Sequence, residues 1–177
     1  MDEQAKAYWD VVDPLVERIN IYDGSQAFLA SISPVPRGVA LVFAADFCLN
    51  EIQNGGFLQF FANSTGVLAP EAVEGFAVIG MPYLAAVVGS VISRLGEPYP
   101  RDRRERARAL LTASGHDEQA IDAILYGSDD RFAALRKATE PLDFDTSDRE
   151  VYRLANNESG GFDAAKERYV EQLPILK

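Results

Sequence analysis

The chain contains one histidine and one cysteine, and neither lies in a pattern typical of a catalytic or metal site. His116 lies in a polar turn, with no nucleophile or orienting acid identifiable beside it. Cys48 lies between Phe47 and Leu49, in an apolar run where an inert buried thiol is expected. These two residues are too few for the usual structural zinc sites, and no phosphate-binding GxxxxGK(S/T) loop or GxGxxG fingerprint is present. We therefore expect no enzyme, no metal and no cofactor, and a carboxylate-only hydrolase is the alternative left open.

A single carboxylate on an apolar segment is the next candidate for chemistry. Asp46 is the one charged residue in the segment 39–49. A charge on a buried helix must be paired, capped or functional. We expect Asp46 to pair with an arginine or with the side-chain amides of residues 51–66.

The most unusual stretch covers residues 51–66, EIQNGGFLQFFANSTG. Its two glycines can end a helix, because glycine accepts a positive φ. Its three phenylalanines follow at spacing i, i+3, i+4 and should pack one face of a second, short helix into the core. We expect a structural corner, and a ligand pocket is the alternative. The residues of this corner or pocket are Asp46, Glu51, Asn54, Gly55, Gly56, Phe57, Gln59, Phe60 and Asn63.

The same stretch resembles the signature of the DNA-mimic protein nineteen family, a bacterial family of which much is catalogued as a domain of unknown function. The resemblance rests on Glu51, Asn54-Gly55-Gly56-Phe57, Gln59-Phe60-Phe61, Asn63-Ser64, Gly66, Ala69-Pro70-Glu71 and Ile79-Gly80, within residues 51–80. It implies an all-α, acidic, often dimeric cytoplasmic domain. The named member type occupies the DNA-binding surface of a transcription regulator.

The charge balance is acidic, with 27 acidic and 17 basic residues and a net charge of −10. A nucleic-acid-binding surface needs a basic excess, so we expect no direct nucleic-acid binding. Carboxylates that could stand in for phosphates form two clusters: Glu3, Asp10, Asp13 and Glu17 near the N-terminus, and Glu140, Asp143, Asp145, Asp148 and Glu150 further on. The preference of helix N-termini for negative charge accounts for Asp148 and Glu150, and explains Glu140, Asp143 and Asp145 least.

An arginine-rich segment carries the opposite charge. It contains Arg101, Arg103, Arg104, Arg106 and Arg108. We expect these side chains to solvate the outer face of a helix and to pair with acids of another segment or subunit. A dimer that stacks acidic on basic faces is one hypothesis.

The elements that must position these residues are expected to be helices, because apolar residues recur at helical spacing and no run alternates with period two. A first helix carries the stripe Tyr8, Val12, Leu15 and Ile19, with a kink or a restart at Pro14. Glycine, proline and capping residues predict helices between Pro70 and Gly80, between Pro82 and Gly96, over 102–113 and 118–126, from a Ser128 cap to about Thr139, from a capping box at Ser147, and over 162–173. The fold class is one all-α domain of about eight or nine helices over residues 1–177.

No membrane segment is expected. The first ten residues are polar and acidic, unlike a signal peptide. The charge-free stretch 75–93 approaches the length of a bilayer span, but Gly80-Met81-Pro82 interrupts it. We expect two buried helices there and a cytoplasmic protein.

Together these patterns predict an acidic interaction protein that blocks a basic, DNA-binding partner, with a homodimer as a further expectation. Two alternatives are an inhibitor or immunity-type protein for another basic protein, such as a nuclease, and a small-ligand module at the Asn54–Asn63 corner.

Overall fold

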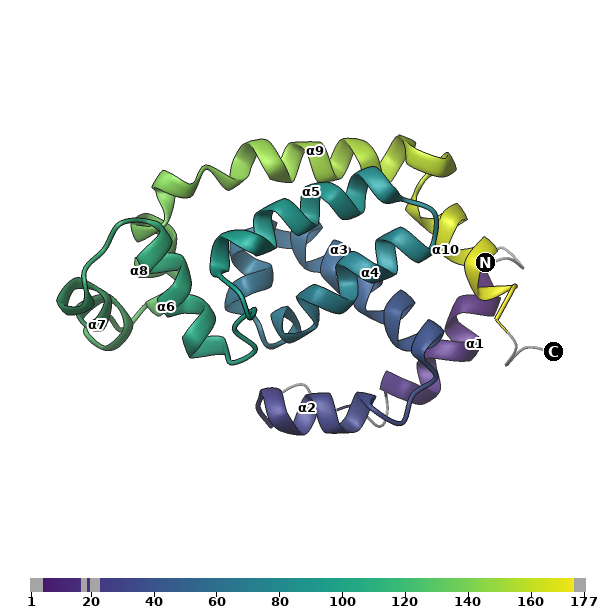
Figure 1. Cartoon of the computed structure of the whole chain (residues 1–177), viewed down its shortest axis with the longest axis horizontal. Helices are drawn as coiled ribbons and strands as arrows, with labels where there is room; N and C mark the ends of the chain where they lie inside the picture. Colours follow the sequence, from purple (N-terminus) through teal and green to yellow (C-terminus); the bar gives the residue numbers. More distant parts are fainter. Residues whose placement is uncertain (1–4, 17–18, 20–22, 174–177) are drawn as a thin grey trace.

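The structure is a computed structural model that describes residues 5–16, 19 and 23–173. This part of the chain forms ten α-helices and no strand (Figure 1). The helices are α1 (Ala5–Val16), α2 (Ser25–Ile32), α3 (Arg37–Ala62), α4 (Ala69–Val78), α5 (Pro82–Ile92), α6 (Arg103–Ala113), α7 (Glu118–Tyr126), α8 (Arg131–Ala138), α9 (Phe144–Asn157) and α10 (Phe162–Val170). Short 3-10 turns η1 (Ser64–Leu68), η2 (Ser93–Leu95), η3 (Glu140–Leu142) and η4 (Glu158–Gly160) join some of them. The all-α prediction is confirmed.

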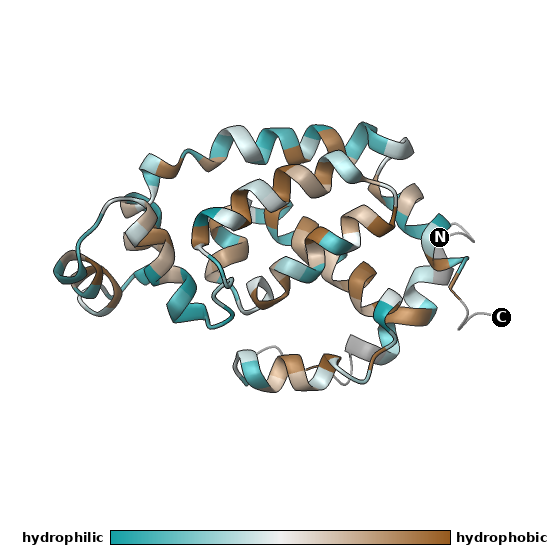
Figure 2. Ribbon diagram, in the orientation of Figure 1, coloured by the Kyte–Doolittle hydropathy of each residue, from teal (hydrophilic) through white to brown (hydrophobic). Residues whose placement is uncertain are grey.

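The core surrounds α3, which is apolar on nearly every side and packs against α4, η1, α9 and α6. Helix α5 lies between α4 and α9, while α6, α7 and α8 form one end of the molecule and α1 and α10 lie at the other (Figure 1). The long α9 turns its apolar residues toward α3 and α5 and its polar residues outward (Figure 2). An amphipathic helix of this kind is held on the surface mainly by its buried stripe.

The charge-free stretch 75–93 is divided as expected. Helix α4 ends at Val78, and α5 begins at Pro82. Gly80 between them has φ +88°, which favours glycine. No helix of the described part is long and apolar enough to cross a membrane.

Several predicted boundaries were wrong, each for a local reason. Helix α9 begins at Phe144, three residues before the expected capping box at Ser147, because Asp143 adopts a left-handed conformation (φ +44°) and ends the preceding turn. Helix α8 is capped by Asp130, which accepts a hydrogen bond from the backbone N–H of Ala133, and not by Ser128. Helix α1 continues through Pro14 without a restart. Helix α2 was not expected, and its residues complete a count of ten against the eight or nine predicted.

The glycine pair divides α3 into two segments, as the sequence predicted. Gly56 has φ +76° and ψ −178°, a region that only glycine occupies readily, whereas Gly55 is non-helical with a negative φ of −166°. A Cβ atom on Gly56 would also lie 2.4 Å from Asp148 Oδ2. Both the backbone conformation and the close approach of α9 therefore require glycine at position 56.

We predict that Gly56→Ala lowers the free energy of unfolding by about 3 kcal/mol, through backbone strain and displacement of Asp148. Gly89→Ala is the matched control, because Gly89 lies inside α5 and its Cβ would meet Val73 at an ordinary 3.5 Å. This control should raise stability by about 0.5–1 kcal/mol. Urea unfolding of both variants measures the difference, and an equal effect of the two would contradict this explanation.

Candidate functional site

The polar residues of the 51–66 stretch converge on the Glu51 carboxylate. Gln59 Nε2 and Asn63 Nδ2 donate to Glu51 Oε2 at 2.9 and 2.8 Å, and Thr65 Oγ1 donates to Oε1 at 2.9 Å. Gln59 lies on the second segment of α3 and Asn63 directly follows its last residue, so both side chains can reach back to the first segment. Both carboxylate oxygens of Glu51 therefore accept hydrogen bonds, and these bonds connect the helical segment before the glycine pair to the residues after it.

The corner is also sealed by aromatic packing. Phe57, Phe60 and Phe61 are all fully buried, as expected. Phe144 of α9 adds a fourth ring, whose centroid lies 6.2 Å from that of Phe57 and 6.0 Å from that of Phe61. Aromatic rings at these separations attract one another beyond their burial. The corner therefore fixes the first turn of α9.

A second contact between α9 and the corner involves Asp148, one of the predicted partner-binding carboxylates. Its Oδ1 accepts a hydrogen bond of 2.9 Å from the backbone N–H of Phe57, the first residue after the glycine pair. Burial raises the pKa of Asp148, the hydrogen bond from Phe57 opposes this shift, and the charge of Asp145 adds to it. Asp148 therefore has a structural role at this corner.

The prediction that the arginine-rich segment solvates the outer face of a helix is wrong for Arg106. This side chain is 1% exposed. Its Nε donates to the carbonyl oxygen of Phe61 at 2.9 Å and its Nη2 to that of Asn63 at 2.6 Å. Burial lowers the pKa of its guanidinium. Position 106 lies four residues before the buried Leu110, a spacing that could have indicated an inward-facing arginine.

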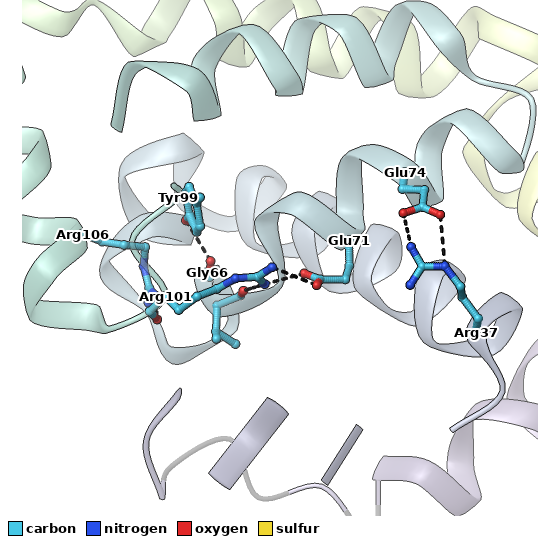
Figure 3. Close-up of polar contacts among 8 residues, drawn as sticks. Arg37, Gly66, Glu71, Glu74, Tyr99, Arg101 and Arg106 are labelled. Carbon is cyan, nitrogen blue, oxygen red and sulfur yellow. Dashed lines mark hydrogen bonds and ion pairs between the residues drawn. The ribbon is translucent and has the colours of Figure 1, made fainter. Parts of the chain in front are cut away.

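Neighbouring groups complete the same cap on the corner (Figure 3). Arg101 forms two hydrogen bonds with Glu71, of 2.6 and 3.0 Å. The Tyr99 hydroxyl donates to the carbonyl oxygen of Gly66 at 2.8 Å. The backbone oxygens at the end of α3 and in η1 are thus satisfied by side chains from the segment 99–106.

Asp46 does not take part in the corner. Its Oδ1 accepts a 2.8 Å hydrogen bond from Lys166 Nζ of α10, and its Oδ2 accepts one of 3.1 Å from Asn50. Both expected partners, an arginine and the amides of residues 51–66, were therefore wrong, and a lysine balances the charge. Lys166 lies on the same face as Phe162 and Val170, and a charge on this apolar stripe was the signal for a buried partner.

The remaining candidates are placed as follows. Cys48 is buried, and burial raises the pKa of its thiol. His116 Nε2 lies 2.9 Å from the carbonyl oxygen of Ala138, so the ring links the α6–α7 turn to the end of α8. Asn54 is exposed. Within the described residues, no group of three or more histidine, cysteine, aspartate and glutamate residues could hold a metal ion.

The predicted partner-binding carboxylates occupy different environments. Glu140 in η3, and Asp143 and Asp145 at the start of α9, are exposed. Glu150 is half-buried and pairs with Arg153, with 2.6 Å between Oε1 and Nη2. On α1, Asp10 and Asp13 are exposed, whereas Glu3 and Glu17 lie outside the described residues.

An all-α chain with this glycine-centred corner can be compared with known families. Residues 33–173 match the model of the family described as DMP19-like protein, and the chain belongs to this family. The resemblance indicated by residues 51–80 is thereby confirmed, and membership suggests a DNA-mimic protein. The comparisons with curated proteins and with solved structures gave no match.

We predict that Glu51→Gln lowers the free energy of unfolding by about 2 kcal/mol. A glutamine retains one acceptor oxygen but turns an amide N–H₂ toward side chains that themselves donate, so charge-assisted hydrogen bonds are lost. Glu74→Gln is the control, because Glu74 forms an exposed pair with Arg37 (Figure 3) and should lose less than about 1 kcal/mol. Equal losses in urea unfolding would contradict the role given to Glu51.

A second prediction concerns Asp148. Asp148→Asn keeps an oxygen that can accept from the Phe57 N–H, whereas Asp148→Ala leaves this donor without its acceptor and should cost about 1–2 kcal/mol. Because folding raises the pKa of Asp148, the folded state binds more protons between the ordinary and the raised pKa. The stability of the native protein relative to Asp148→Asn should therefore fall as the pH rises through this acidic window. A stability difference that rises with pH in urea titrations would refute this assignment.

Proposed function

We propose that the chain is an acidic interaction protein whose carboxylates bind the DNA-binding surface of a basic partner protein. Family membership supports the class of function. The observation that carries the choice of surface is the environment of Glu140, Asp143 and Asp145. All three are exposed, and none forms an ion pair with a described residue.

Several other acids of the chain already have cationic partners. Glu118 and Asp122 both pair with Arg108, each at 2.6 Å, and Glu71 pairs with Arg101. A carboxylate that is already neutralised offers less to a partner's cation. The better candidate is thus the segment that runs from η3 into the first turn of α9, whose exposed carboxylates Glu140, Asp143 and Asp145 are called here the α9 acidic surface.

The chemistry of such a surface matches that of a phosphate backbone. Arginine and lysine side chains that bind phosphate oxygens bind carboxylate oxygens with the same donors. Complementary charge acts mainly on the rate of encounter and on partner choice, and it weakens as salt rises. Asp148 and Glu150, which hold Phe57 and Arg153, should contribute less to this surface.

A homodimer belongs to the same proposal. Proteins that bind DNA tightly contact on the order of 6–10 phosphates, more than one α9 acidic surface can imitate. Two copies would double the number of carboxylates, and Asp10 and Asp13 on α1 would add to it. Sedimentation at low and high salt measures the oligomeric state, and a monomer under both conditions would remove the dimer from the proposal.

The test begins by capturing a partner from lysate of the source organism, identifying it by mass spectrometry and purifying it. The purified partner is then titrated against the double reversal Glu140→Lys/Asp145→Lys. Asp143 is left unchanged because its left-handed backbone favours its side chain. We expect binding to weaken by about tenfold or more, because each reversal replaces an attraction with a repulsion.

Glu97→Lys/Glu105→Lys is the matched control, since it changes the net charge equally at two exposed acids outside the α9 acidic surface. It should bind nearly as well as the native protein, and duplex DNA should displace the native protein from the partner. If both double variants weaken binding equally, the loss of affinity comes from the change in net charge and not from the α9 acidic surface. A partner that DNA does not displace would favour the inhibitor alternative over DNA mimicry.

A further inference from the structure

Residues of α1, α3, α9 and α10 line a cleft of about 990 Å³. Helices α1 and α10 lie at the end of the molecule opposite α7 (Figure 1). The Asp46–Lys166 ion pair lies in its wall, and both side chains are almost completely buried. The cleft is separate from the Glu51 corner and from the α9 acidic surface, none of whose residues line it.

Two buried polar atoms in this cleft have no hydrogen-bond partner in the structure. They are the hydroxyl oxygen of Tyr8 and Oε2 of Glu167. Tyr8 is 1% exposed, so water does not replace the missing partner at its hydroxyl. A buried polar group without a partner costs free energy, and more so when it is charged. The cleft therefore offers hydrogen-bonding capacity that the described chain does not use.

The chemistry of the lining favours a cation. Lys166 shows how a cation is held there, because its Nζ lies 2.8 Å from Asp46, 3.2 Å from Asp163 and 4.1 Å from the centre of the Tyr8 ring. Four acids line the cleft, Asp46, Asp163, Glu167 and Glu171, against the two bases Lys166 and Arg168. Burial raises the pKa of Glu167, whereas the charge of Lys166 and a hydrogen bond from the backbone N–H of Tyr8 lower it. Glu167 forms no ion pair with a described residue, so its carboxylate can pair with a second cation.

An aromatic surface suited to a cation lies in the same lining. Trp9 follows Tyr8 on α1, and its side chain is 49% exposed. Tryptophan is the aromatic side chain that attracts cations most strongly to its face. Carboxylates beside an exposed indole are the features that recognise guanidinium and ammonium groups.

We propose that this cleft binds an organic cation of the guanidinium or alkylammonium class, which pairs with the carboxylate of Glu167 and lies against Trp9. The cation can come from a free amine or from a basic side chain of a protein. The proposal does not depend on the α9 acidic surface, so either can fail without the other.

Trp9 provides the readout, because it is the single tryptophan of the chain. Its fluorescence is titrated with agmatine, a free guanidinium cation, with N-acetylarginine amide, an arginine with a blocked backbone, and with glutarate as an anion. We expect a saturable change with at least one of the two cations and none with glutarate. Saturation by agmatine alone identifies a free amine, and saturation by the blocked arginine identifies a protein side chain as an acceptable source.

The variant Glu167→Gln should lower the affinity for the cation by about tenfold, which is the effect expected from the loss of one charge-assisted hydrogen bond. Asp129→Asn is the matched control, since Asp129 is exposed in the α7–α8 turn at the other end of the molecule, and it should bind as the native protein does. Circular dichroism verifies that both variants fold, and Glu171→Gln replaces Glu167→Gln if the latter does not. No saturable response to either cation, or equal affinity in the native protein and the cleft variant, would overturn the proposal.

Discussion

The break in α3 at Gly55 and Gly56 is the constraint on which the rest of the structure depends. A helix interrupted in the core leaves backbone groups and polar side chains that need partners away from water. Glu51 accepts hydrogen bonds from three side chains beyond the break, and Asp148 accepts one from the first backbone N–H after it. Arg106 donates to two carbonyl oxygens at the end of α3 and just beyond it. Because Asp148 belongs to α9 and Arg106 to α6, the same break also determines where these two helices pack.

Much of the fold could be predicted because its signals are local. A glycine pair, or a glycine followed closely by a proline, ends one helix and allows the next to begin because of the backbone conformations that these residues adopt. The boundary between α4 and α5 could be predicted from Gly80 and Pro82 in this way. The partners of buried charges could not be predicted in the same way. Lys166 lies 120 residues from Asp46, and Asp148 lies 91 residues from Phe57, so nothing local identifies either pair. The start of α9 was missed because a left-handed aspartate carries no clear sequence signal.

The family signature and the proposed partner surface perform different tasks. The signature residues stabilise the corner, since the oxygens of Glu51 and the phenylalanine rings are occupied within the chain. The α9 acidic surface begins where Phe144 packs against that corner, so the corner positions carboxylates that it does not itself supply. Substitutions at the corner should therefore act through stability, and substitutions of Glu140 or Asp145 through binding.

The most direct test of the account is carbodiimide labelling of the carboxylates, read by mass spectrometry, in the free protein and in its complex with the captured partner. This measurement reports which side chains the partner covers, without altering any of them. The account predicts that labelling of Glu140, Asp143 and Asp145 falls in the complex, while labelling of Glu97 and Glu105 does not change. Unchanged labelling of the first three, with protection elsewhere on the chain, would contradict it.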